Sequence, residues 1–147
     1  MAFTINRIMA ESGDEAIFEI VSTGDAVGTG DSTTIDVDGG GVGDLANPVT
    51  WGGTAPNMEV LGVSALVCGP VNGFVTLAWQ TPPGPGTTTF LTLAHGQTES
   101  RLKFRSSNVG DDIVISSVQP GAGVLVPFTL RLRVRKLSGF AFSSVKP

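Results

Sequence analysis

Apolar and polar residues alternate along much of the chain with a period of two, which is the pattern of β-strands that bury one face. The segment from Phe128 to Arg135 shows it most clearly, because its even positions are apolar and its odd positions are polar or cationic. One face of this strand is expected in a core, and the other carries a row of arginines. Residues 101–105 repeat the pattern, with Leu102 and Phe104 expected inward and three cations outward.

Short runs rich in Val, Ile, Thr and Phe, bounded by Gly, Pro, Asn or Asp, predict strands throughout the chain. The one weak helical candidate, residues 10–18, has Gly13 in its middle. Two apolar runs, 73–80 and 87–94, are joined by a stiff Pro/Gly tract and are expected to form a central hairpin. The predicted strands are 2–9, 15–22, 32–37, 58–68, 73–80, 87–94, 100–106, 112–118 and 124–137. Their spacing predicts an all-β protein, an antiparallel sandwich of about eight strands with jelly-roll-like or immunoglobulin-like topology.

Residues 23–57 differ from the rest of the chain, because they are rich in Gly and Asp and poor in large apolar side chains. We expect an extended loop or arm here, with a short strand at 33–37, within a single domain covering 1–147. A compact domain rarely spends this much chain on a loop without a use for it. The segment is therefore expected to bind a partner or to order against a neighbouring subunit.

The 13 acidic and 9 basic residues, which give a net charge of -4, are separated along the chain. Residues 1–59 hold ten of the acids and one base, whereas residues 60–147 hold eight bases and three acids. Two readings stay open. Acids of the first part could pair with the cationic strands inside one molecule, or the cations could meet a neighbouring subunit or another acidic partner.

The second reading predicts an interface on the cationic strands. Six cations on one outer face would repel one another, so an acidic surface is expected to cover them, and the acids of 23–57 are the large supply. The predicted interface residues are Arg101, Lys103, Arg105, Arg131, Arg133, Arg135, Asp25, Asp31, Asp36 and Asp38. Nucleic acid is not the expected partner, because this face has no interleaved aromatic residues and the protein is acidic overall. The low charge content and the strands that are apolar on both faces predict a homo-oligomer, with a trimer favoured.

The sequence contains no obvious catalytic or metal-binding set, so no enzyme activity, cofactor or metal is expected. Its one histidine, His95, is expected in a turn or as a partly buried structural residue, and its one cysteine, Cys68, is expected to be a small buried hydrophobe. The acids around 36–44 lack the third ligand and closing Glu of a calcium hand. An alternative is a carbohydrate-binding or adhesion module that uses Trp51 with loop acids and calcium. A small β-sandwich hydrolase is a third and weaker hypothesis.

The run Asn72–Trp79 followed by Thr88–Leu93 resembles hairpins in phage structural proteins. Over residues 58–137 the chain is similar to the small all-β decoration or cement proteins of tailed bacteriophage capsids. The start of the chain has no basic region followed by an apolar run, and no window has 18 consecutive apolar residues, so neither secretion nor a membrane partner is expected. The resemblance implies a virion protein, assembled in the host cytoplasm, that binds the lattice of the major capsid protein and stabilises it. It implies no particular site residue.

Overall fold

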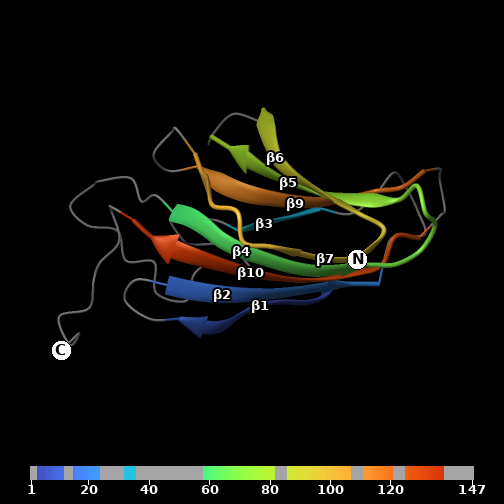
Figure 1. Ribbon diagram of the computed structural model, residues 1–147, viewed down its shortest axis with the longest axis horizontal. Coiled ribbons are helices and arrows are strands. Elements are labelled where there is room, and N and C mark those ends of the chain that lie inside the picture. The colour runs from blue at the N-terminus through green and yellow to red at the C-terminus, as the bar shows by residue number, and fades with distance from the viewer. Residues whose placement is uncertain are drawn as a thin grey trace.

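The computed structural model describes residues 3–11, 15–23, 32–35, 58–81, 86–106, 111–120 and 125–137, and within these ranges every regular element is a β-strand (Figure 1). The strands are β1 (Phe3–Glu11), β2 (Glu15–Ser22), β3 (Ser32–Ile35), β4 (Met58–Val67), β5 (Phe74–Gln80), β6 (Thr87–Ala94), β7 (Gly96–Ser100), β8 (Phe104–Arg105), β9 (Asp112–Val118) and β10 (Phe128–Lys136). The described part of the chain has no helix long and apolar enough to cross a membrane.

The strands form two antiparallel sheets, which lie one over the other in Figure 1. The first sheet has the order β1-β2-β10-β4-β7, and β8 also pairs with β4. The second sheet has the order β3-β9-β5-β6. The predicted all-β class and two-sheet arrangement are confirmed, with ten described strands rather than about eight.

The core lies between the sheets and follows the period of two. In β10, Phe128, Leu130, Leu132 and Val134 are buried and the residues between them are exposed, as predicted. Strands β5 and β9 bury alternate residues in the same way, and Trp79 belongs to this core. The largest fully buried side chains are Phe18, Ile20, Ile35, Met58, Leu77, Leu93, Ile113, Ile115, Leu130 and Leu132. Both sheets therefore contribute to one apolar layer.

Two glycines allow sharp changes of direction. Gly96 has a φ of 109°, and the chain changes there from the second sheet (β6) to the first (β7). Gly69 has a φ of 89° in the turn after β4, where a Cβ would lie 2.5 Å from the carbonyl oxygen of Leu125. A side chain at Gly69 would therefore be strained and would collide with neighbouring backbone.

Several local predictions are wrong. The strand predicted at 100–106 is two strands, because the ladder with β4 stops after Ser100 and resumes at Phe104. Leu102 lies in the break and is 67% exposed rather than buried. Cys68 is exposed, because it keeps the outward direction of Ser64 and Leu66 beyond the end of β4.

Strand pairing also settles the weak helical candidate and the position of the predicted hairpin. The weak helical candidate at 10–18 is the end of β1 and the start of β2, which pair antiparallel. The predicted hairpin does form, as β5 and β6, but only β5 is central. The strand expected at 33–37 is present as β3. The described residues do not include 24–31 and 36–57, and these ranges contain Asp25, Asp31, Asp36, Asp38 and Trp51.

Truncation of an inward residue of β10 tests the position of the core. Leu132→Ala should lower the free energy of unfolding by about 2–5 kcal/mol, because Leu132 is fully buried between the sheets. The neighbouring exposed Thr129→Ala should change it by less than about 0.5 kcal/mol. Urea denaturation followed by tryptophan fluorescence measures both, and equal effects of the two variants would contradict the assigned faces.

Candidate functional site

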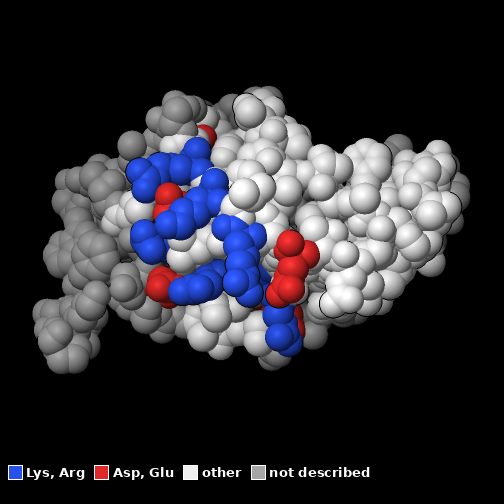
Figure 2. Space-filling model, viewed as in Figure 1, with Lys and Arg blue, Asp and Glu red and all other residues white. Residues whose placement is uncertain are grey.

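The outer face of the first sheet and the exposed break between β7 and β8, together called here the charged face, carry the six cations that the sequence analysis singled out. Alternation in β10 brings its three arginines to this side, beside the acids of β2 and β4. Figure 2 shows Lys and Arg side chains gathered at one end of the molecule with acidic side chains among them. The charges are therefore concentrated on one part of the surface.

Two arginines of β10 pair with glutamates of β2. Arg131 lies opposite Glu19 in the strand register, and its Nη2 is 3.3 Å from the Oε2 of Glu19. Arg133 reaches Glu15 diagonally, with 2.6 Å between its Nε and the glutamate Oε1. The hydrogen bond and the negative charge of Glu15 raise the pKa of the Arg133 guanidinium above its ordinary value. Both arginines are thus paired with carboxylates of β2.

Glu59 of β4 lies between two other arginines. Its Oε2 accepts a hydrogen bond from Arg105 of β8 at 3.0 Å, and its Oε1 is 3.6 Å from Arg135 of β10. The strand register places Arg135 and Arg105 on either side of Glu59. Although Glu59 is on an outer face, it is only 7% exposed. One buried carboxylate therefore links three strands across the face.

These contacts support the first reading of the charge separation, pairing within one molecule, for four of the six cations. Acids from the N-terminal part of the same chain pair with Arg105, Arg131, Arg133 and Arg135. Acids outside 23–57 thus already pair with these four cations, whereas the predicted contact with Asp25, Asp31, Asp36 and Asp38 stays a prediction, because these residues lie outside the described ranges. Arg101 and Lys103 make no ion pair with any residue that the structure describes.

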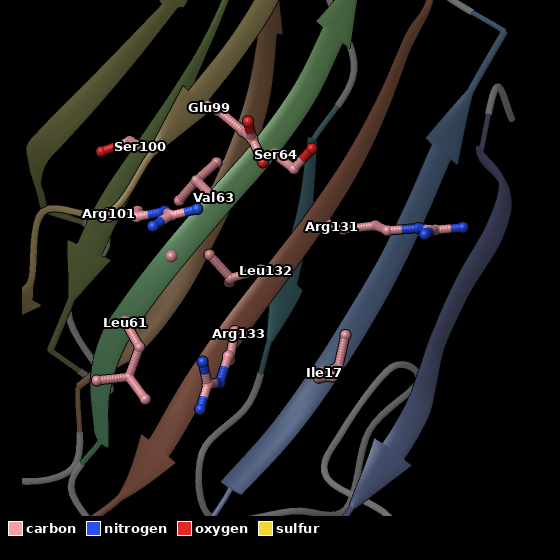
Figure 3. Close-up of a pocket in the computed structure, with 11 residues that line it drawn as sticks. Ile17, Leu61, Val63, Ser64, Glu99, Ser100, Arg101, Arg131, Leu132 and Arg133 are labelled. Atoms are coloured by element: carbon pink, nitrogen blue, oxygen red, sulfur yellow. The ribbon is translucent and has the colours of Figure 1, made fainter.

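A groove of about 400 Å³ opens on the charged face beside Arg101. It lies at a β-bulge, because Val134 pairs with Val60 while Arg133 pairs with Gly62, so Leu61 is an extra residue in β4. In the close-up of Figure 3, Arg101 extends over β4, whereas Arg131 extends over β2. The remaining lining includes Ile17, Leu61, Gly62, Ser64, Glu99, Ser100 and Arg133. A guanidinium beside hydroxyls in an open groove can bind a carboxylate of another molecule.

The structure also contains a buried carboxylate that the sequence analysis did not single out. Asp111 is only 2% exposed and accepts hydrogen bonds from the hydroxyls of Thr81, at 2.6 Å, and Ser106. It joins the residues that follow β5 and β8 to the start of β9. The signal for this structural role of Asp111 is its burial, and no local sequence pattern reveals which carboxylate is buried.

The remaining chemical candidates do not come together. His95 is exposed in the bend between β6 and β7, so its predicted turn position is confirmed, and Cys68 is exposed in a different turn. The described residues contain no group of three or more His, Cys, Asp or Glu side chains that could hold a metal ion. Trp51 and the loop acids of the carbohydrate-binding alternative lie outside the described ranges.

The outer face of the second sheet, called here the hydroxyl face, has a different character. The described strands of this sheet contain one charged residue, Asp112, at the buried start of β9. The register places Ser32, Ser116, Thr76 and Thr92 in one row across the four strands, and the hydroxyls of the two serines are 3.1 Å apart. The two outer faces thus differ sharply in charge.

The sequence matches no protein-family model and no curated protein. The resemblance to phage decoration proteins and the interface assignment therefore stay predictions. The preference for a trimer stays a prediction as well.

Removal of the Glu59 charge tests whether the charged face contributes to stability. Glu59→Gln should lower the free energy of unfolding by about 1–2 kcal/mol, because a nearly buried carboxylate loses two arginine partners. Glu99→Gln, which changes an exposed carboxylate on the same face, should stay within about 0.5 kcal/mol of the wild type. Urea unfolding of the three proteins in one buffer gives the comparison, and equal stabilities would show that the Glu59 pairs contribute nothing.

Proposed function

We propose that this protein is a non-enzymatic structural protein of a phage virion, which attaches to the assembled capsid as a decoration or cement protein. The observation that carries the proposal is the charged face, a broad and shallow surface on which Arg101 and Lys103 are exposed without an ion pair to any described residue. Shallow, extended surfaces bind macromolecules over an area, whereas small ligands are usually enclosed in deeper pockets. A capsid shell offers such an area.

The charged face is suited to a protein partner because its groups are already in place. Hydrogen bonds between the strands and the ion pairs of Glu15, Glu19 and Glu59 hold the arginines before any partner arrives. A preorganised surface loses less conformational freedom on binding. Among the side chains described on this face, six cations stand against the acids Glu15, Glu19, Glu59 and Glu99. The partner that fits is therefore an acidic patch, and charge complementarity would set its orientation.

A repeating shell would increase the number of weak contacts of this kind that one oligomer can make. Exposed ion pairs contribute only about 0–1 kcal/mol each, so one such site gives modest affinity. An oligomer that touches several capsid subunits gains avidity without a new type of contact. Because it binds only the assembled shell, it also stabilises that shell by mass action. The virion, assembled in the host cytoplasm, is the proposed location.

Binding to heads tests this function. Heads from a phage that encodes the chain, prepared with its gene deleted, should bind the purified protein to saturation at a fixed stoichiometry in co-sedimentation. Bound heads should resist heating better than bare heads, and added salt should weaken attachment, because the contact is charged. Protein that stays in the supernatant at every concentration would contradict the proposal.

Charge reversal identifies the surface that attaches. The double variant Arg101→Glu and Lys103→Glu should weaken attachment at least about tenfold, because it places acids against an acidic partner. A control, Val71→Glu with Asn72→Glu, adds the same two glutamates to the exposed turn between β4 and β5 without removing a cation and should bind like the wild type. Thermal melts establish that both variants fold. If the first pair binds heads as tightly as the control, the charged face is not the attachment surface.

A further inference from the structure

Strand β6 is an edge of the second sheet. It pairs with β5 on one side, and no strand within the described ranges pairs with its other side (Figure 1). In an antiparallel ladder, alternate N–H and C=O groups point away from the paired neighbour. The free side of β6 therefore presents a row of backbone donors and acceptors that can template another strand.

The other described sheet edges have features that hinder pairing, and β6 has few. Strand β3 is only four residues long. Strand β1 has two register irregularities and the charged residues Arg7 and Glu11. Strands β7 and β8 include Glu99 and Arg105. By contrast, β6 has eight residues, no charge and no proline, and its one irregularity is the extra residue Phe90. Natural proteins rarely leave such an edge open to solvent.

Apolar side chains of β6 lie at the margin of the core and are only half-buried. Phe90 stacks on Trp79 with 4.7 Å between ring centroids and lies 5.0 Å from Phe104. Leu91 also packs against the core from this strand. A strand added to the free side of β6 would cover Phe90 and Leu91 further, and the burial of apolar surface favours association.

The occupant that fits this edge is uncharged, because β6 offers no charge to attract an ionic partner. A two-fold contact brings the same residues of two copies together, so a charged edge would repel itself and an uncharged edge does not. Half of β6 is threonine, which favours strands and pairs well with threonine across a ladder. A second copy of β6 meets both conditions.

We propose that β6 pairs antiparallel with β6 of a second copy, which joins the two second sheets into one continuous sheet of eight strands. The charged face of each copy stays open in this dimer, because it belongs to the other sheet. The two-fold contact differs from the trimer that the sequence analysis favoured. It is independent of capsid attachment, so either proposal can hold without the other.

Sedimentation with edge-blocking variants tests the contact. With a reductant present to keep Cys68 as a thiol, the 15.1 kDa chain should sediment as a dimer of about 30 kDa at micromolar concentration. The double variant Thr89→Lys with Thr92→Lys places lysines at two exposed positions of β6. It should raise the dimer dissociation constant at least about tenfold, because like charges meet across the two-fold axis. Amide hydrogen exchange in 87–94 should slow in the wild type as its concentration rises.

A control separates edge pairing from a general effect of charge. Val71→Lys with Asn72→Lys adds the same charge in the β4–β5 turn and should remain dimeric. A monomeric or trimeric wild type, or unchanged mass after Thr89→Lys with Thr92→Lys, would overturn the β6 contact. If the protein binds heads as a monomer, the proposed function holds and the β6 contact does not. If it forms the β6 dimer but does not bind heads, the β6 contact holds and the proposed function does not.

Discussion

The central strands of both sheets give one face to the core between the sheets, and only their outward positions remain for charge and for binding. In β10 this constraint operates residue by residue, because Leu132 is fully buried while Arg131 and Arg133, on either side of it, are exposed. The row of arginines is thus a consequence of the same alternation that builds the core. A one-residue slip of β10 would bring its arginines into the apolar layer, so the core fixes where the cations lie.

The bulge in β4 is the main departure from this alternation, and the charged face depends on it. Val60 and Val63 both point inward although they are three positions apart, because Leu61 is an additional residue. On the Met58 side of the bulge, Glu59 points outward between two arginines. At the bulge, Gly62 leaves the floor of the groove open, and a Cβ there would lie 3.5 Å from the carbonyl oxygen of Ser100. One extra residue therefore separates a paired charge cluster from an open groove.

Local pattern predicts the strands of this fold better than their contacts. Strands 15–22, 87–94 and 112–118 occur where the alternation and turn residues predict them. Ion-pair partners could not be read from the sequence, because Arg131 and Glu19 are 112 residues apart and meet only once the register is set. Leu102 was misplaced because a break in the ladder with β4 has no local signature.

The same distinction applies to the candidate site. The gathering of the six cations was predictable from the sequence, whereas the pairing of four of them, and the position of Arg101 and Lys103 in a break between strands, was not. The buried Asp111 depends on hydroxyls from two other parts of the chain. The uncharged edge of β6 is visible in the sequence as a threonine-rich run, but its position at the edge follows from sheet order, which is a property of the whole fold.

Two surfaces of different chemistry lie on opposite sheets, and the proposed function assigns the charged face to the contact with the capsid. A cryo-electron microscopy map of heads carrying this protein tests this assignment, because it shows which sheet lies against the shell. We expect the outer face of the first sheet to lie against the shell, with Arg101 over an acidic patch. The second sheet should then face away from the shell. Density that places the second sheet against the shell, or heads with no density for this protein, would contradict the claim.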